Sequence, residues 1–352
     1  MKMENVTLRT RTLGKTDVIV PTMGVGTMLW MPNKSLTEEE LMMTYSACLD
    51  NGLNFFDTAE IYGNGISERI IGKCIKRDKR PVMIASKFMP PSSMNPLKQK
   101  RKTVSSDSPR ALFEALDNSL LRLGVDYLDL YQMHSPSTKN TITEYMDVMA
   151  EAIKTGKIRS VGVCNFSVMQ IHEAYEALAK HNIPLATAMI GYNLLRRWPE
   201  KNGVLDTCKE LGISVIPYAP LAEGILTGKY RDKKKVPIGY VIATYFGHLN
   251  FTKERNESTT FLKNLLTKPL EIDKKKIEPL FKTLDEIASK HNKTLAQVAI
   301  NWLLTNEEVC IIPIPGMKNV RQVNDNIGAL GWRLTKEERL HINEVNISSG
   351  KK

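Results

Sequence analysis

The chain has 352 residues, of which 42% are hydrophobic and 25% are charged, and its net charge is +11. This composition excludes a mainly disordered or collagen-like chain and is typical of a globular protein with a sizeable core. No uninterrupted apolar run approaches the roughly 20 residues of a membrane-spanning helix, so we expect no membrane-embedded segment.

The cysteines and the N-terminus bear on the cellular compartment. Five cysteines stand singly at positions 48, 74, 164, 208 and 310, without the paired spacing of a zinc site. The first residues lack the apolar stretch of a secretory signal. We therefore expect reduced thiols, no bound metal and a cytoplasmic location.

The basic residues occur in short clusters at 98–102, 231–235, 274–276 and 351–352. Such an excess fits an acidic partner, whether a phosphate-bearing cofactor, a nucleic acid or an anionic surface. The clusters are not interleaved with the aromatic residues of a base-stacking surface. We therefore interpret them as solvated loop charge and expect no nucleic-acid partner.

After residue 20, apolar β-branched runs alternate with segments of helical periodicity. The expected strands cover residues 23–28, 53–59, 82–88, 128–134, 158–166, 185–193, 214–221 and 309–316. Between them, residues 108–124 place leucines on one helix face, with Ser108 as the N-cap and Gly124 as the closing residue. Residues 168–181 and 294–306 follow the same helical pattern.

Eight strand–helix units predict a parallel sheet that helices cover on both faces. Such a sheet either closes into a barrel or stays open. No Gly-x-Gly-x-x-Gly turn follows the first strand, which favours closure over a doubly wound sheet. We predict an α/β fold, a single (β/α)8 TIM barrel domain across residues 1–352.

Two segments depart from this alternation. Residues 8–21 are typical of a β-hairpin that turns at Gly14 and Lys15 and plugs the barrel floor. Residues 229–276 follow the seventh strand as a long, charged loop, and loops of this size are usually functional or disordered. In a barrel this loop overhangs the catalytic face, although a variable surface insertion is an equal alternative.

Four polar side chains stand at or just beyond expected strand ends, namely Asp57, Tyr62, Lys87 and His134. The C-terminal ends of barrel strands carry the catalytic groups of barrel enzymes. Each residue alone also fits a structural role, as a turn cap, a half-buried aromatic, a snorkelling lysine or a core histidine. The set is more informative, because a buried lysine needs a carboxylate partner and Asp57 ends the neighbouring strand.

The same set predicts proton-transfer chemistry. A lysine cation beside Tyr62 is expected to lower the pKa of the phenol from about 10, which makes Tyr62 a proton donor nearer neutral pH. His134 then orients a carbonyl oxygen or shares the proton. The predicted chemistry is the protonation of a developing alkoxide.

Six motifs occur in an order that resembles the aldo-keto reductase superfamily: FFDTAEIYGNGISERIIGK, ASKF, LDLYQMHSP, VGVCNF, PYAPLAEGILTGKY and IPIPGMKNVRQVNDNIGA. The resemblance extends over most of the chain, least over 229–276, and is nearest to the pyridoxal-reductase-like and sugar-reductase-like branches. It implies a (β/α)8 barrel, NADPH as cofactor, and reduction of aldehydes or ketones to alcohols. It makes Tyr62 the general acid and His134 the residue that orients the carbonyl. Lys87 and Asp57 become the pair that tunes Tyr62.

The resemblance also implies cofactor-binding residues. Tyr218 matches the aromatic that stacks on the nicotinamide, and Asn165 matches the residue that holds its carboxamide. Lys318 favours the 2′-phosphate of NADPH over NADH. The loop after the seventh strand is expected to embrace the pyrophosphate, and a helix N-terminus after the eighth receives a phosphate. The other residues carried over are Gly26, Thr27, Leu221, Gly224, Leu226, Gly228, Lys229, Gly316, Gln322, Asp325 and Asn326.

Two of the cofactor-binding positions depart from the family pattern. Cys164 stands where the family has a serine, and Met189 where it has a glutamine, and both of those residues normally hydrogen-bond the carboxamide. Each lost neutral hydrogen bond costs about 0.5–1.5 kcal/mol, so we expect weaker cofactor binding rather than its loss. Met189 alternatively packs its thioether on the nicotinamide ring.

Three functional hypotheses follow. An NADPH-dependent carbonyl reductase is favoured because all four catalytic positions are filled. An NADP(H)-binding regulatory or sensor protein with little turnover is the alternative, since potassium-channel β subunits resemble this chain. A barrel acting on a phosphorylated sugar has no use for Tyr218 as a stacking platform.

The expected partner is a small-molecule carbonyl substrate, and the oligomeric state stays open. Trp30 and Phe88 are expected to line the substrate pocket, together with Met28, Leu29, Met89 and the 229–276 insertion at its rim. This mixture suits aromatic or medium-sized aldehydes, because methionines tolerate varied shapes.

Overall fold

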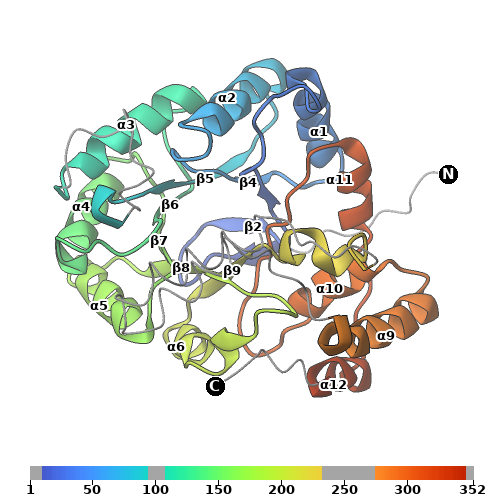
Figure 1. Cartoon of the computed structure of the whole chain (residues 1–352). Helices are drawn as coiled ribbons and strands as arrows, with labels where there is room; N and C mark the ends of the chain where they lie inside the picture. The colour runs from blue at the N-terminus through green and yellow to red at the C-terminus, as the bar shows by residue number, and fades with distance from the viewer. Residues whose placement is uncertain (1–9, 94–107, 232–273, 346–352) are drawn as a thin grey trace, which may run out of the picture.

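The computed structural model describes residues 10–93, 108–231 and 274–345. Seven parallel strands pair in chain order into one curved sheet, and helices surround it (Figure 1). Each strand lies within one of the first seven expected runs, so those strands are confirmed. They are β3 (Val25–Gly26), β4 (Phe55–Asp57), β5 (Met83–Phe88), β6 (Leu130–Met133), β7 (Val161–Cys164), β8 (Leu185–Gly191) and β9 (Ser214–Tyr218).

The eighth expected run, 309–316, closes the sheet without forming a regular strand, which corrects the prediction at this point. Isolated parallel bridges join the run to β9 on one side and to β3 on the other. The carbonyls of Pro313 and Pro315 accept from the backbone N–H groups of Gly24 and Gly26 at 3.0 and 3.1 Å. Proline has no N–H to donate, so the ladder is interrupted although the barrel still closes.

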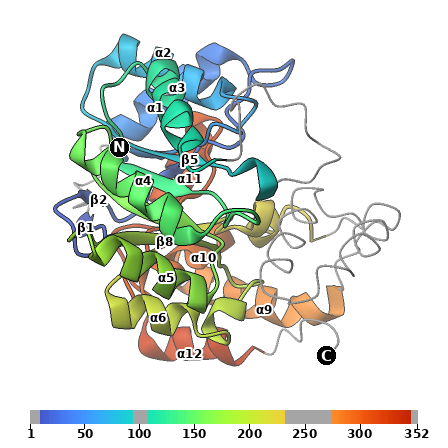
Figure 2. The same ribbon diagram turned by 90° about the vertical axis from the view of Figure 1, so that its left-hand side faces the viewer.

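The helices lie around the sheet, as Figures 1 and 2 show. They are α1 (Glu38–Asp50), α2 (Ile66–Asp78), α3 (Ala111–Leu123), α4 (Ile142–Lys154), α5 (Val168–Ala179), α6 (Val204–Leu211), α9 (Lys274–His291), α10 (Leu295–Leu304), α11 (Val320–Ile327) and α12 (Lys336–Glu344), with the 3-10 turns η1 (Pro91–Ser93), η3 (Trp198–Glu200) and η4 (Ala222–Thr227). The helices expected within 168–181 and 294–306 are confirmed as α5 and α10.

The start of α3 differs from the prediction. Residues 108–110 form a turn in which the carbonyl of Ser108 accepts from the N–H of Ala111, so Arg110 rather than Ser108 is the N-cap. The predicted end is confirmed, because Gly124 closes the helix in the left-handed conformation with φ +67°.

An antiparallel hairpin closes the floor of the barrel, as predicted. Strands β1 (Thr10–Thr12) and β2 (Ile19–Pro21) pair with each other, and Figure 2 shows them at one end of the barrel. The hairpin side chains Leu13, Val18 and Val20 are fully buried. They pack against the barrel-interior side chains Phe55, Ala85, Leu130, Ala186, Ile216 and Ile312.

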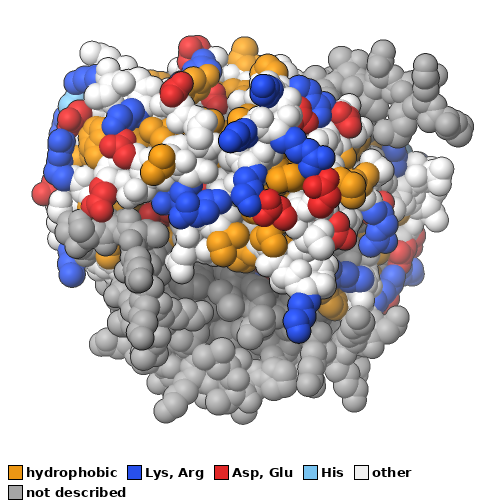
Figure 3. Space-filling view, turned by 90° about the horizontal axis from the view of Figure 1, so that it is seen from above, with side chains coloured by type: hydrophobic (Ala, Val, Ile, Leu, Met, Phe, Trp, Pro, Cys, Tyr) orange, Lys and Arg blue, Asp and Glu red, His pale blue; other side chains and the backbone are white. Residues whose placement is uncertain are grey.

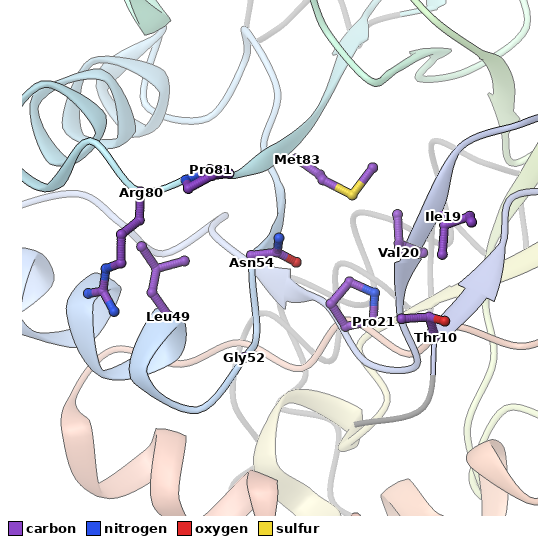
Figure 4. Close-up of a pocket in the computed structure, with 10 residues that line it drawn as sticks. All are labelled: Thr10, Ile19, Val20, Pro21, Leu49, Gly52, Asn54, Arg80, Pro81 and Met83. Atoms are coloured by element: carbon purple, nitrogen blue, oxygen red, sulfur yellow. The ribbon is translucent and has the colours of Figure 1, made fainter. Parts of the chain in front are cut away.

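A pocket of about 400 Å³ lies on the floor side, between the hairpin and the loops that precede β4 and β5 (Figure 4). Apolar side chains such as Ile19, Leu49 and Met83 form much of its lining. Its one cationic lining residue, Arg80, is already paired with Asp50 and Asp78 at 2.7 and 2.6 Å. Barrel enzymes carry their catalytic groups at the opposite end of the strands, away from this pocket.

Most of the predicted 229–276 loop, and most of the basic residues of the sequence clusters, lie outside the described residues. The end of the predicted loop is corrected, because α9 already begins at Lys274. Figure 3 shows basic and acidic side chains interspersed over the face that it views. Across α1 and α2, Lys73 pairs with Glu38 at 2.8 Å. In the described ranges, no helix is long and apolar enough to cross a membrane.

We expect Gly14→Ala to destabilise the fold more than Gly124→Ala does. Both glycines have positive φ, +56° and +67°, so each substitution carries a similar conformational cost of about 1–2 kcal/mol. A Cβ on Gly14 would lie 2.6 Å from the carbonyl oxygen of Ala186, whereas no described atom lies within 4 Å of one on Gly124. Urea denaturation should show an additional loss of about 1–3 kcal/mol for Gly14→Ala. Equal losses would contradict a tightly packed floor.

Candidate active site

A buried ion pair lies at the C-terminal ends of β4 and β5. The Nζ atom of Lys87 is 2.6 Å from Oδ1 of Asp57, and the two side chains are 0% and 2% exposed. Side chains alternate along β5, and Met83 and Ala85 contact the barrel interior, so Lys87 faces the interior as well. The predicted partnership of Lys87 with Asp57 is therefore confirmed.

Lys87 reaches two further oxygens at the mouth of the barrel. Its ammonium donates to the carbonyl of Thr58 at 2.7 Å and to the hydroxyl of Tyr62 at 3.3 Å. With Asp57, these acceptors match the three N–H donors of a lysine. Because the Tyr62 oxygen accepts from Lys87, this bond does not use the phenolic hydrogen of Tyr62.

The pKa of Tyr62 corrects the sequence prediction. Burial raises the pKa of this phenol to about 12, although the Lys87 cation acts in the lowering direction. The cation does not prevail because burial of the phenol has the larger effect on its pKa, and the Asp57 carboxylate acts in the same raising direction as burial. Tyr62 is therefore fully protonated at neutral pH.

Lys87 itself stays cationic. Burial lowers the pKa of its ammonium, but the carboxylate of Asp57 and the other neighbouring groups outweigh burial and hold that pKa above its ordinary value. The site therefore combines a permanent buried cation with a neutral phenol that touches it.

His134, Asn165 and Tyr218 join Tyr62 at the mouth. The imidazole of His134 meets the Tyr62 ring edge-on, with 5.8 Å between ring centroids. The amide Nδ2 of Asn165 donates to the carbonyl of His134 at 3.2 Å, and the hydroxyl of Tyr218 donates to Asn165 Oδ1 at 3.0 Å. The strand ends of β6, β7 and β9 are thus linked beside the ion pair. Asn165 has φ +60°, a conformation that asparagine tolerates better than most residues.

Cys164 and Met189, the two departures from the family pattern, lie side by side on paired strands. They are 1% and 2% exposed and belong to the barrel-interior cluster against which Tyr218 packs. Burial raises the pKa of the Cys164 thiol well above its ordinary value, so the thiol is neutral. The surface beneath Tyr218 is therefore apolar at both positions.

The loop after β9 has a strained backbone. Ala219, Ala222 and Glu223 have φ of +51°, +48° and +53°, and Gly224 follows with φ +91°. Non-glycine residues in this region are held by their surroundings, and they concentrate at ligand clamps and active sites. Here Arg196, which is 5% exposed, pairs with Glu223 at 3.0 Å and holds the loop.

The predicted pyrophosphate residues of this loop divide into two groups. Leu221 is half-buried at the start of η4, Gly228 closes η4 with φ +80°, and Lys229 is exposed. A Cβ on Gly224 would lie 2.7 Å from Nζ of Lys229, so the lysine lies directly beside this glycine. Leu226, in contrast, is fully buried in the core between the barrel and the helices.

The predicted adenosine-phosphate residues also lie together. Gly316 is exposed and bridges to Gly26, where a Cβ would meet the carbonyl of Ile314 at 2.8 Å. The backbone N–H of Lys318 donates to Oε1 of Gln322 at 2.8 Å. Lys318 precedes α11, and Gln322 lies in the first turn of that helix. On the next turn of the same helix, residue 325 is exposed and residue 326 is buried.

Three predicted ligand-facing side chains are turned toward the protein instead. The hydroxyl of Thr27 donates to the carbonyl of Asp57 at 2.8 Å and is fully buried. Trp30 is also fully buried, and its indole N–H donates to a backbone carbonyl at 2.7 Å. Phe88 packs on Tyr145 of α4, because it alternates with Lys87 and points out of the barrel. The pocket-lining prediction for Trp30 and Phe88 is therefore wrong.

Sequence reasoning missed several residues that shape the site. Thr58 supplies a carbonyl to Lys87, and Glu60, fully buried, accepts from the backbone N–H of Met89 at 3.0 Å. A Cβ on Gly191 would lie 3.0 Å from the ring of Tyr218, so this glycine makes room for the tyrosine. Gly191 could have been singled out from the sequence, because it is a glycine near the end of the expected 185–193 strand. The sequence carries no comparable signal for the burial of Glu60.

Comparison with known proteins agrees with this geometry. The family model described as "Aldo/keto reductase family" matches residues 22–347. The chain is 34% identical to the chloroplastic pyridoxal reductase of Arabidopsis thaliana, over 92% of this chain and 82% of that protein. It is 29% identical to an NADP(+)-linked aldo-keto reductase of Schizosaccharomyces pombe, over 97% and 92% of the two chains.

Two further comparisons extend the similarity. The chain is 27% identical to the L-glyceraldehyde 3-phosphate reductase of Escherichia coli K12, over 97% of this chain and 92% of that protein. Among solved structures, it resembles a thermostable aldo-keto reductase in complex with the inhibitor epalrestat. That match has a TM-score of 0.70 and 27% identity, and it covers 96% of this chain and 100% of the other.

We expect Lys87→Met to destabilise the protein strongly, because it leaves the buried carboxylate of Asp57 without its counter-ion. Breaking a buried pair on one side costs about 3–5 kcal/mol. The double variant Asp57→Asn/Lys87→Met removes both charges and should recover most of that loss. Urea unfolding at pH 7 measures the free energy of unfolding of the single and the double variant. A double variant as unstable as Lys87→Met would contradict the ion pair.

Proposed function

The chain belongs to the aldo/keto reductase family, and from this premise we propose that it reduces the carbonyl group of an aldehyde or ketone to an alcohol with NADPH. One observation carries the proposal. The Tyr62 hydroxyl lies 3.3 Å from Nζ of Lys87, which is itself paired with the buried carboxylate of Asp57. A phenol held against a buried cation is suited to protonating an oxygen on which negative charge develops.

The residues divide the work among them. Bound NADPH supplies the hydride that the carbonyl carbon receives. Tyr62 donates its phenolic hydrogen to the carbonyl oxygen, and Lys87 stabilises the phenolate that Tyr62 becomes. His134, edge-on to the phenol, orients the carbonyl oxygen toward it. Asp57 keeps Lys87 charged and in position.

The described residues fit a nicotinamide dinucleotide. Oδ2 of Asp57 is buried and has no hydrogen-bond partner among the described residues, so it can accept from a ligand hydroxyl. Tyr218 offers a ring for stacking, and the Asn165 amide retains one N–H and one lone pair beyond its two hydrogen bonds. Lys318, beside the N-terminus of α11, provides a cation for the 2′-phosphate, which is why we propose NADPH rather than NADH.

We propose an uncharged aldehyde of aromatic or medium size as the substrate. Met28 and Leu29 follow β3 at the mouth and are 51% and 48% exposed, and Met89 follows β5. Flexible apolar side chains adapt to varied ring shapes. One relative is named for pyridoxal and another for a phosphorylated triose. The apolar rim in the described ranges favours a substrate of the first kind.

Tyr62→Phe tests the proposal directly. It removes the phenolic hydrogen and keeps the ring, so turnover of an aldehyde panel that includes pyridoxal and 4-nitrobenzaldehyde should fall by about 10²–10⁴-fold. NADPH binding, measured by fluorescence titration, should stay unchanged. Tyr127→Phe, at a tyrosine that is 46% exposed, is the control and should keep full activity.

The outcomes separate the candidates. Full turnover in Tyr62→Phe would contradict the role of the phenol. NADPH binding by the wild type without turnover of any carbonyl would favour an NADP(H) sensor, the second candidate, to which the apolar positions of Cys164 and Met189 lend weight. No NADPH binding at all would contradict the cofactor assignment.

The pH dependence should differ between the two directions of the reaction. Alcohol oxidation needs Tyr62 as the phenolate, and because its pKa is raised to about 12, the phenolate fraction grows about tenfold per pH unit below that value. The rate of alcohol oxidation should therefore rise continuously from pH 7 to pH 10. The rate of aldehyde reduction should not change through ionisation of Tyr62 over the same range. Initial rates over a range in which circular dichroism shows a folded protein provide the measurement. An oxidation plateau that begins below about pH 9 would mean that Lys87 outweighs burial.

A further inference from the structure

Three hydroxyl groups meet close to the ion pair, at residues that follow the strand ends. They belong to Thr27 after β3, Thr58 after β4 and Ser67 in the first turn of α2, and all three side chains are fully buried. The Ser67 oxygen is 2.9 Å from the Thr27 hydroxyl and 3.0 Å from the Thr58 hydroxyl. We call these three residues the hydroxyl cluster.

The oxygens of the cluster make four short contacts. The Thr27 hydroxyl is 2.8 Å from the carbonyl of Asp57, and the Ser67 hydroxyl is 3.0 Å from the carbonyl of Thr27. Each hydroxyl has only one hydrogen to give, so three hydrogens are shared among these two contacts and the two contacts of Ser67 with the threonine hydroxyls. Ser67 is the central member, because its oxygen contacts both threonine hydroxyls.

The cluster fixes the two residues that hold Lys87. The carbonyl of Asp57 accepts from both the backbone N–H and the hydroxyl of Thr27, at 3.0 and 2.8 Å. The side chain of Thr58 is tied to Ser67, while its carbonyl accepts from Lys87 at 2.7 Å. Two of the three acceptors of the Lys87 ammonium therefore come from residues that the cluster anchors.

Helix capping does not account for Ser67. The N-cap of α2 is Gly65, in the left-handed conformation and without a side-chain cap. The Ser67 oxygen bonds instead to residues that follow β3 and β4. These bonds tie the start of the 58–65 loop, which carries Tyr62, to the helix that ends it.

We propose that Ser67 is a positioning residue of the active site, which acts through Thr58 and Asp57 to set the place of the Lys87 ammonium against Tyr62. The proposal rests on the proposed function. The hydroxyl cluster contacts neither the hydride nor the proton that is transferred in the proposed reaction. It acts by setting the distance between the Lys87 ammonium and the Tyr62 phenol. Small misplacements of catalytic groups reduce turnover strongly, by up to about 100-fold for 1 Å.

The first test is Ser67→Ala in the full-length protein. We expect kcat for aldehyde reduction to fall by about tenfold, since the displacement is expected to be smaller than 1 Å. KM and the NADPH dissociation constant should stay unchanged, because the Ser67 side chain is fully buried and the hydroxyl of Thr27, which it contacts, is turned toward the protein. Ser160→Ala is the matched control. Ser160 is a serine with 1% exposure before β7, and its hydroxyl donates to the carbonyl of Asp129 at 2.5 Å, far along the strands from the site.

A second pair of variants guards against simple unfolding. Thr58→Val keeps the shape of the side chain and removes the hydroxyl, so it should reduce kcat as Ser67→Ala does. Thr58→Ser keeps the hydroxyl and should recover most of the loss. Combining Ser67→Ala with Thr58→Val should cost little more than either alone, because both break the same link.

A spectroscopic measurement makes the test independent of turnover. The 15N signal of the Lys87 ammonium, identified by its absence in Lys87→Met, should shift or broaden in Ser67→Ala and not in Ser160→Ala. A wild type without turnover would overturn the proposed function, while the ammonium signal would still test positioning. A Ser67→Ala protein with lowered melting temperature, unchanged kcat and an unchanged ammonium signal would overturn the positioning role.

Discussion

The buried pair of Lys87 and Asp57 is the constraint around which the mouth of the barrel is organised. A charge withdrawn from water is costly, and its partner repays that cost only where the geometry is good and the remaining donors are satisfied. Lys87 meets both conditions, with a carboxylate at 2.6 Å and acceptors on Thr58 and Tyr62. The residues that satisfy the lysine are also those that bring the phenol to it, so one arrangement provides stability and chemistry together.

The rest of the barrel supports this pair by excluding water from below. Apolar side chains form a continuous cluster above the hairpin, from Leu13 at the floor to Met189 and Cys164 beneath the mouth. The buried polar side chains Gln132 and Thr187 are bonded to each other at 3.2 Å. Because water is excluded, the attraction between the lysine and its partners is stronger than it would be in water. Cys164 and Met189 also bear on the proposed cofactor site, where Asn165 and Tyr218 would be the polar groups nearest the nicotinamide ring.

The ordered motifs allowed most of the architecture to be predicted, and they indicated the four polar residues that the structure brings together at the mouth, because strands that end in polar residues have a direct sequence signal. The failures have separate causes. The eighth strand was misjudged because alternating prolines keep the β-like pattern while removing the donors. Phe88 was misassigned because the face on which one residue lies depends on the exact alternation of side chains along the strand. The direction of the Tyr62 pKa shift was wrong because the burial of a side chain cannot be derived from sequence spacing. The hydroxyl cluster joins residues 40 positions apart and has no local signature.

Closure of the barrel by residues 309–316 has a consequence for folding. The segment that seals the gap between β9 and β3 follows all seven strands in the chain, so the seven strands are synthesised before the sheet can close. Until then the edges of β3 and β9 are unpaired, and an edge strand is a template for wrong pairing. Strands β4 and β5 also bring Asp57 and Lys87 together while one side of the sheet is still exposed to water. The buried environment of Lys87 is therefore acquired only after residues 309–316 have been synthesised.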